Sequence, residues 1–421
     1  MIVNFFLKLK NISKETKKLF ENILALSALQ FINYILPLFT FPYLVRTLGI
    51  EQFGFFAFIT SVISYFRIII DYGFNLTATR DIAINQYNHR QLIQIFNSVI
   101  IIKFFLFLIS ALILLSITIF IKKFEYHQLL YFLAFMTLAG ETFLPLWFFQ
   151  GMEDMKYITA ISAFSKLIYT LFIFYLINQP SDIYKIFLIN SITNILISLH
   201  ALRTIKIKYN IYFEKQSYIT IWQHAYNTWS IFVSNISISL YTISATFILG
   251  IFTNNTVVGY FAAAEKIIHA FKVLATPISQ ALFPYINKNK QRDLNFTWKL
   301  SKYIFISTGL LSILIFIFAQ DIIFFLMGKA YTNSITLLKI MSPLPLLIGL
   351  SNLFGIQTML PFGKTKAFSK ILFTGAIFGI FLSLFLVPSY HHIGSAITQL
   401  LVETFITFSM FIYIYFNIRK I

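Results

Sequence analysis

The stretch IIIKFFLFLISALILLSITIF, residues 100–120, contains a single charged side chain, that of Lys103. A helix needs about 20 apolar residues to cross about 30 Å of hydrocarbon, so this stretch predicts a membrane span. The rest of the chain has the same character, because 58% of its 421 residues are hydrophobic and only 11% are charged. Soluble domains carry about 25% charged residues. The composition therefore predicts an all-α, polytopic membrane protein.

The same criterion places about twelve transmembrane helices along the chain. The basic, polar stretch from Arg203 to His224 separates six of them from the other six. We therefore expect two six-helix domains, at residues 1–208 and 209–421. The predicted spans are 22–45, 54–73, 95–121, 127–150, 157–178 and 183–203 in the first half, and 225–251, 257–283, 301–326, 333–360, 367–388 and 393–416 in the second.

The distribution of basic residues predicts the orientation of these helices. Cytoplasmic loops hold an excess of Lys and Arg. With the amino terminus inside, the inside segments carry 22 of the 33 Lys and Arg residues, the outside segments five and the spans six. Both termini are therefore expected in the cytoplasm. The net charge of +18 is explained by these short clusters, which do not form the contiguous basic patch that nucleic-acid binding requires.

Several kinds of chemistry have no support in the sequence. The chain has no cysteine, and its seven histidines lack metal-ligand spacing, so neither a metal site nor thiol catalysis is expected. Neither a phosphate-binding loop nor a dinucleotide-binding glycine motif follows a strand-like run, so no cofactor is expected. The chain is predicted not to be an enzyme, and an ion gradient is the expected energy source.

Two similar segments suggest an internal duplication. Residues 48–58 read LGIEQFGFFAF and residues 249–264 read LGIFTNNTVVGYFAAA. Each has LGI at the end of a predicted helix, then a short turn, then a glycine followed by aromatic residues. Because each half holds an even number of spans, the halves share one orientation, and the axis relating them would lie along the membrane normal.

Charged residues within the predicted spans are candidate functional residues, because an ionised group at mid-bilayer costs at least about 2.5–3.5 kcal/mol on insertion scales. In the eighth span, Glu265, His269 and Lys272 follow at i, i+4 and i+7, which places them on one helix face, and Lys266 lies beside them. This group could bind an anion or relay protons. The alternative is a ladder of charges that only holds helices together.

Span two carries Arg67 and Asp71 at i and i+4, with an internal salt bridge as the alternative to a functional role. Six basic residues face four acidic ones within the spans, and such a cationic interior favours anionic cargo. Lys103, Lys166 and Lys339 are expected nearer helix ends, where long side chains reach the headgroups.

Four segments are similar to the O-antigen and polysaccharide flippases (Wzx type) of the multidrug/oligosaccharidyl-lipid/polysaccharide exporter superfamily. These segments are LPLFTFPYLVRTLGIEQFGFFAF (36–58), DYGFNLTATRDIA (71–83), PLWFFQGMEDMKYIT (145–159) and VGYFAAAEKIIHAFKVLATPISQALFPYI (258–286). A fifth segment, GIQTMLPFGKTKAF at residues 355–368, is a looser match.

The resemblance implies two six-helix bundles around a central cavity in the bacterial inner membrane. It implies ion-coupled transport of polyprenyl-pyrophosphate-linked O-antigen units to the periplasmic leaflet during lipopolysaccharide biosynthesis. It suggests a polysaccharide polymerase and a chain-length regulator as partners, besides membrane lipids. The motif positions implied to line the cavity or gate it are Arg46, Asp71, Arg80, Gln150, Glu265 and Lys266.

Other functions remain open at this point. A multidrug exporter of the same superfamily shares the fold, although exporters of organic cations are expected to have acidic cavities. A membrane polymerase or glycosyltransferase would be expected to carry a sizeable extramembrane loop. Arg46 closes span one and is either an interface anchor or a functional residue.

Overall fold

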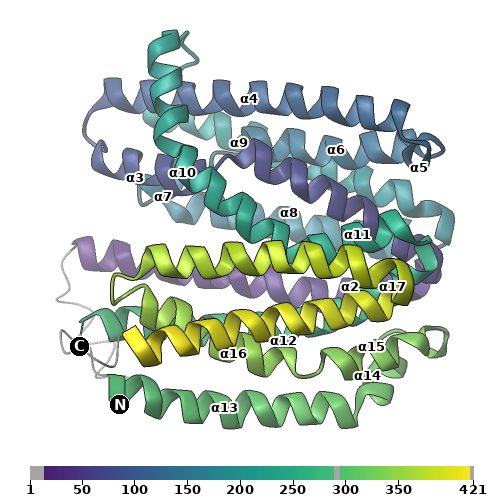
Figure 1. Ribbon diagram of the computed structural model, residues 1–421. Coiled ribbons are helices and arrows are strands. Elements are labelled where there is room, and N and C mark those ends of the chain that lie inside the picture. The colour runs from purple at the N-terminus through teal and green to yellow at the C-terminus, as the bar shows by residue number, and fades with distance from the viewer. Residues whose placement is uncertain (1–13, 289–293, 418–421) are drawn as a thin grey trace, which may run out of the picture. The chain divides into compact units, whose positions relative to one another are not determined.

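The computed structural model describes residues 14–288 and 294–417, and all its regular elements there are helical (Figure 1). The first half of the chain forms α2 (Lys14–Asp71), α3 (Phe74–Ile84), α4 (His89–Phe120), α5 (Lys122–Glu125), α6 (Gln128–Phe143), α7 (Leu146–Gly151), α8 (Met155–Leu176), η2 (Pro180–Asp182) and α9 (Ile183–Tyr209). The second half forms α10 (Tyr218–Thr242), α11 (Ser244–Phe252), α12 (Asn255–Lys288), α13 (Leu294–Ile317), α14 (Ala319–Leu326), η3 (Lys329–Tyr331), α15 (Asn333–Met341), α16 (Leu344–Phe354), the π-helix η4 (Gly355–Met359) and α17 (Thr365–Asn417).

Every predicted span falls on one or more of these helices. Within the described residues, eight segments are long and apolar enough to cross a membrane, and two of them, Ile35–Ile84 and Thr365–Asn417, each cover two predicted spans. Both are broken inside by a left-handed residue, Gly49 with φ 69° in α2 and His391 with φ 48° in α17. The predicted spans 225–251 and 257–283 lie on α10–α11 and α12, outside the eight segments.

Prolines stand at the breaks that divide two of the predicted spans into shorter helices, Pro145 in the fourth and Pro343 in the tenth. The fourth predicted span is divided at Pro145, between α6 and α7. Proline lacks a backbone N–H and disfavours the helical conformation in the residue before it, and Leu144 is accordingly extended. The short helix α7 that follows carries Gln150, one of the candidate residues.

The chain forms two compact units, and α2 contributes to both. The first unit comprises the residues up to Thr40 together with Phe66–Asn178 and Tyr184–Val233. The second comprises Phe41–Tyr65, Gln179–Ile183 and Ser234–Ile421. The division into domains at residues 208 and 209 stays a prediction.

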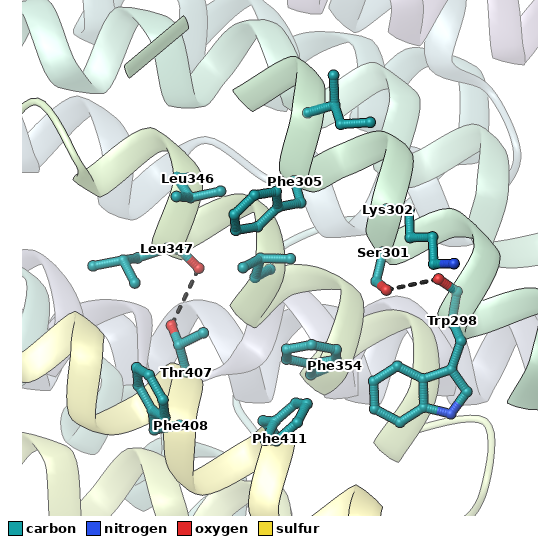
Figure 2. Close-up of a pocket in the computed structure, with 12 residues that line it drawn as sticks. Trp298, Ser301, Lys302, Phe305, Leu346, Leu347, Phe354, Thr407, Phe408 and Phe411 are labelled. Atoms are coloured by element: carbon teal, nitrogen blue, oxygen red, sulfur yellow. Dashed lines mark hydrogen bonds between the residues drawn. The ribbon is translucent and has the colours of Figure 1, made fainter. Parts of the chain in front are cut away.

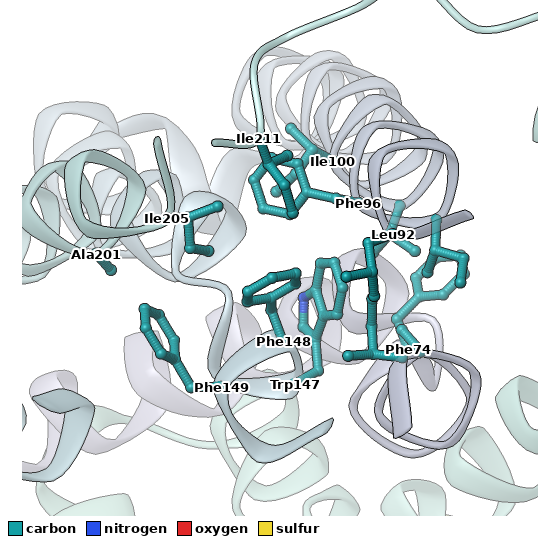
Figure 3. Close-up of a cluster of buried hydrophobic side chains, with 14 of the residues drawn as sticks. Phe74, Leu92, Phe96, Ile100, Trp147, Phe148, Phe149, Ala201, Ile205 and Ile211 are labelled. Carbon is teal, nitrogen blue, oxygen red and sulfur yellow. The ribbon is translucent and has the colours of Figure 1, made fainter. Parts of the chain in front are cut away.

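Aromatic packing builds the core of the first unit. The rings of Trp147 and Phe148 in α7 lie 5.9 and 5.7 Å from the ring of Phe96 in α4, and all three are buried (Figure 3). Phe74 of α3 and Ile205 of α9 belong to the same cluster. These contacts fix α3 and α7, which carry Arg80 and Gln150, against the long helices α4 and α9.

Two glycines bring helices of the second unit into backbone contact. A Cβ atom added at Gly54 in α2 would lie 1.8 Å from the carbonyl oxygen of Asn255, and one added at Gly259 in α12 would lie 2.3 Å from that of Ile50. These are the glycines of the two similar segments, and Ile50 and Asn255 stand four residues before them. The contact is therefore reciprocal, as a pseudo-twofold relation requires, and it supports the predicted duplication.

We predict that Gly54→Ala lowers the free energy of unfolding by about 1–3 kcal/mol, because the added methyl group must push two helix backbones apart. The measurement is thermal unfolding of the purified protein in detergent.

Gly309→Ala in α13 is the matched control, because the nearest atom to its added Cβ is Leu346 Cδ1 at 4.0 Å. It should unfold at or above the wild-type temperature, since alanine favours a helix over glycine. Wild-type stability of Gly54→Ala would contradict the close contact.

Candidate functional site

Charged side chains from three helices meet in the first unit. In α2, Arg67 donates two hydrogen bonds to Glu141 of α6, at 2.6 Å from Nε and 2.8 Å from a terminal nitrogen. One turn further along α2, a carboxylate oxygen of Asp71 lies 4.0 Å from Nζ of Lys103 in α4. Asp71 also accepts a hydrogen bond of 2.7 Å from Asn75. Neither Arg67 nor Asp71 thus forms the i, i+4 pair that was the alternative to a functional role.

Lys103 occupies a different position from the one expected. Its side chain is 5% exposed and lies near the middle of α4, so the expectation that it reaches the headgroups is wrong. The helix begins at His89, six residues before the predicted start of the span, which places Lys103 about 21 Å along it at 1.5 Å per residue. A buried ammonium group needs an opposite charge, and Asp71 supplies it.

A third basic residue extends this cluster. Lys166 of α8 interacts electrostatically with Glu141, which also binds Arg67. Gly140, the residue before Glu141, permits the close approach of α6 to α9, because a Cβ there would lie 2.4 Å from the backbone carbon of Asn194. We call Arg67, Asp71, Lys103, Glu141 and Lys166 the charge cluster. It holds three basic and two acidic groups.

Arg80 and Gln150 lie on the two short helices α3 and α7, which pack closely. Arg80 pairs with its neighbour Asp81 at 2.8 Å, and its side chain is 62% exposed. Thr79 lies 3.4 Å from Gln150, from its hydroxyl oxygen to Oε1. A Cβ at Gly151 would lie 2.6 Å from Ile82. The structure thus brings Arg80 and Gln150 to adjacent turns of a rigid helix pair in the first unit.

The second unit contains a polar cavity of about 500 Å³. Three of the predicted residues, Glu265, Lys266 and His269, line it together, on α12. A hydroxyl of α11, Thr246, donates a hydrogen bond of 2.9 Å to Glu265. Further polar side chains from α2 and α17 complete the lining, namely Thr60, Ser61, Ser64, Gln399 and Glu403.

Glu403 is the most buried acidic side chain of this cavity. It is 3% exposed, and its carboxylate accepts a hydrogen bond of 2.7 Å from Ser351 in α16. Glu403 and Glu141 are acidic residues within the predicted spans, and neither is among the candidates predicted from the sequence. A single acidic residue in an apolar run gave no spacing pattern, so only the fold reveals its partners.

The remaining two candidates are Arg46 and Lys272. Arg46 donates a hydrogen bond to the carbonyl oxygen of Phe325 at the end of α14, and nearby Tyr331 donates one of 3.2 Å to that of Val45. Arg46 thus holds a helix end within the second unit. Lys272 is on α12, but its side chain lies outside the described part of the structure. In the described residues, no group of three or more His, Asp and Glu residues is placed to hold a metal ion.

Solved structures show the fold of this protein. The lipid II flippase MurJ in an inward closed conformation superposes with a TM-score of 0.73 at 14% identity, over 93% of this chain and 87% of that one. An outward-facing multidrug transporter of the MOP superfamily gives 0.61 at 14% identity, over 94% and 96%. The chain therefore has the fold of MOP-superfamily membrane transporters, which confirms the predicted all-α polytopic fold.

Sequence comparison gives the family. Residues 19–290 match the family described as "Polysaccharide biosynthesis protein", and the chain belongs to this family of transporters, not to an enzyme family. A protein of Escherichia coli (strain K12) described as "Putative O-antigen transporter" is 34% identical over 398 residues, 94% of this chain and 96% of its own. A Shigella dysenteriae protein of the same description is 28% identical over 93% and 98%. The resemblance seen in the motifs is confirmed.

We predict that Lys103→Met destabilises the protein by about 3–5 kcal/mol, because it leaves Asp71 without its cation in a buried site. Asp71→Asn should act in the same direction. The double variant Lys103→Met/Asp71→Asn should recover most of the loss, since it removes both charges. The measurement is a double-mutant cycle of thermal unfolding in detergent.

Lys339→Met is the control, because this lysine lies on an exposed face, 5.7 Å over the ring of Phe316. It should cost less than about 1 kcal/mol. Additive effects of Lys103→Met and Asp71→Asn would show that the two charges are not coupled.

Proposed function

We propose that this protein is a flippase that moves polyprenyl-pyrophosphate-linked O-antigen repeat units from the cytoplasmic to the periplasmic leaflet of the bacterial inner membrane. The relationship to the Escherichia coli protein carries the proposal, because it extends over nearly the full length of both chains at 34% identity. The fold agrees with it, since the chain superposes on a solved lipid-carrier flippase. Ion-coupled alternating access is the proposed cycle.

The charge cluster supports an anionic cargo. Its three basic groups exceed its two carboxylates by one, within helices that cross the membrane. Pyrophosphate oxygens accept paired hydrogen bonds from a guanidinium group in the same geometry as a carboxylate. Arg67 already presents two donors in this geometry to Glu141, and its side chain is 47% exposed. We propose that cargo phosphate replaces Glu141 as the partner of Arg67 during transport.

The arrangement of basic side chains also separates this proposal from export of organic cations. Such a cargo would be repelled by a surplus of positive charge in a medium of low dielectric constant. The multidrug transporter that shares the fold does so at 14% identity, which carries no information on cargo. The cluster therefore favours the oligosaccharide pyrophosphate over a cationic drug.

The polar cavity of the second unit is the proposed place of ion coupling. Glu265, His269 and Glu403 bring carboxylate and imidazole groups to one cavity, and these are the groups that exchange protons or hold cations within membranes. Lys266 and Lys272 of the same helix are proposed as further cavity residues. Arg46, Arg80 and Gln150 are proposed to gate access to the cargo path.

The proposed orientation places both termini in the cytoplasm. The excess of Lys and Arg in the segments expected on the cytoplasmic side supports this orientation. The proposed partners are a polysaccharide polymerase and a chain-length regulator, which would receive the repeat units in the periplasm.

The test expresses the protein in bacterial strains that lack their own O-antigen transporter and make different repeat units. We expect Arg67→Ala/Glu141→Ala to lower surface O-antigen roughly tenfold or more, because a charge-assisted bond to the cargo is lost. The double change keeps the local charge balanced, so membrane levels of the protein should stay normal by immunoblot.

The proposed orientation has its own test. A reporter fused after Lys208 should be cytoplasmic.

Lys122→Ala is the matched control, because this lysine is exposed in the short helix α5 and lies outside the charge cluster. It should keep wild-type surface O-antigen. Wild-type levels in Arg67→Ala/Glu141→Ala would contradict the cationic path, and failure of the wild-type protein to export any O-antigen unit would contradict the cargo.

A further inference from the structure

The second unit contains another cavity, of about 640 Å³, whose lining differs from that of the polar one. Helices α13, α16 and α17 form it (Figure 2). Trp298, Ser301, Lys302, Phe305 and Ile306 of α13 line it at successive i, i+3, i+4, i+7 and i+8 positions, which is one face of a helix. We call this cavity the apolar groove.

The hydroxyl groups in the wall of the groove are hydrogen-bonded to the backbone. The hydroxyl of Ser301 donates to the carbonyl oxygen of Trp298 at 2.8 Å, and that of Thr407 donates to Leu347 at 3.2 Å (Figure 2). Thr407 is also 2.7 Å from the carbonyl oxygen of Glu403. The groove therefore presents a hydrocarbon surface, and its one charged lining residue is Lys302.

The groove opens to the surroundings of the protein. Phe305, Ile306 and Phe408, which line it, are 55%, 66% and 57% exposed. The helix that carries the first two is long and apolar enough to cross a membrane, as the segment Trp298–Ile317, and in that position hydrocarbon would surround these side chains. Lys302 lies in the second turn of this segment, where basic side chains meet lipid headgroups. The next exposed lysine, Lys299, lies one turn earlier.

We propose that the apolar groove binds one acyl chain of an anionic phospholipid, whose phosphate is held by Lys302. Charge complementarity selects an anionic headgroup, and the apolar wall accepts the chain. Lipid binding in the groove does not depend on which cargo the protein moves. The groove requires only that α13, α16 and α17 cross a membrane.

The size of the groove suits one acyl chain. A methylene group fills about the same volume as a water molecule, roughly 30 Å³. A cavity of about 640 Å³ then holds on the order of 20 carbon atoms. The groove is therefore large enough for one phospholipid acyl chain. The wall also belongs to the core of the second unit, since Trp298, Leu350 and Phe354 pack in the cluster around Met410.

Trp298 provides a probe inside the groove, because its indole lies 5.7 Å from the ring of Phe411 and 6.3 Å from that of Phe354. In a Trp222→Phe/Trp229→Phe background, the remaining tryptophans are Trp298 and the fully buried Trp147. The experiment measures quenching of this protein in vesicles by phospholipids with brominated acyl chains, either phosphatidylglycerol or phosphatidylcholine. Adding Trp298→Phe gives the background from Trp147.

We expect brominated phosphatidylglycerol to reach half-maximal quenching at about fivefold lower mole fraction than phosphatidylcholine, as one lysine at the surface gives. Lys302→Ala should remove this difference, while Lys370→Ala, an exposed lysine outside the groove lining, should keep it. Leu350→Phe should reduce quenching by filling the groove, and Ile313→Phe on the exposed face of α13 should not.

Equal quenching by the two lipids, unchanged by Leu350→Phe, would overturn the proposal and leave only general contact with the bilayer. Stronger displacement of brominated phosphatidylglycerol by a polyprenyl phosphate than by unlabelled phosphatidylglycerol would also overturn it. The unsubstituted chain in detergent supplies a second measurement, because bound phosphatidylglycerol should raise its unfolding temperature and phosphatidylcholine should not. Equal shifts with both lipids would count against the site.

Discussion

Hydrocarbon does not solvate an ionised side chain, and this constraint governs the arrangement of charges in this protein. Each charge within a membrane-spanning helix needs a partner, because a buried ion without one costs several kcal/mol. Lys103, 5% exposed in the middle of α4, faces Asp71 of α2. Arg67 binds Glu141 of α6 through two hydrogen bonds. These pairs tie three helices of the first unit together, and Lys166 adds the one positive charge by which the charge cluster departs from neutrality.

The same constraint accounts for the difference between the two cavities of the second unit. Where Glu265, Lys266, His269 and Glu403 line a cavity, hydroxyl and amide groups surround them, and Thr246 and Ser351 donate hydrogen bonds to the two carboxylates. In the apolar groove, by contrast, the hydroxyl groups turn back to the backbone. One cavity is therefore suited to ions and the other to a hydrocarbon chain.

The positions of the helices could be predicted from the sequence. The partners of the charged residues within them could not. Every span expected from apolar length lies on one or more helices. The glycines of the two LGI segments pointed to the duplication that Gly54 and Gly259 support with a reciprocal contact. The i, i+4 spacing places Glu265 and His269 on one helix face, and both line one cavity together with Lys266. The pairs Arg67–Glu141 and Lys103–Asp71, however, join helices far apart in the chain, and no pattern within one helix contains that information. The position of Lys103 along its helix was predicted wrongly because α4 begins at His89. The first turns of α4 are polar, so the apolar criterion started the span too late.

Reconstitution tests most directly the proposed movement of a lipid-linked pyrophosphate through a cationic path. The measurement is the rate at which polyprenyl-pyrophosphate-linked oligosaccharide becomes accessible to an external glycosidase in sealed vesicles that contain only the purified protein and an imposed ion gradient. We expect rapid exposure of this substrate and none of the same oligosaccharide on an uncharged polyprenyl alcohol. Equal rates for the charged and the uncharged lipid, or no transport of either alongside efflux of an organic cation, would contradict the account.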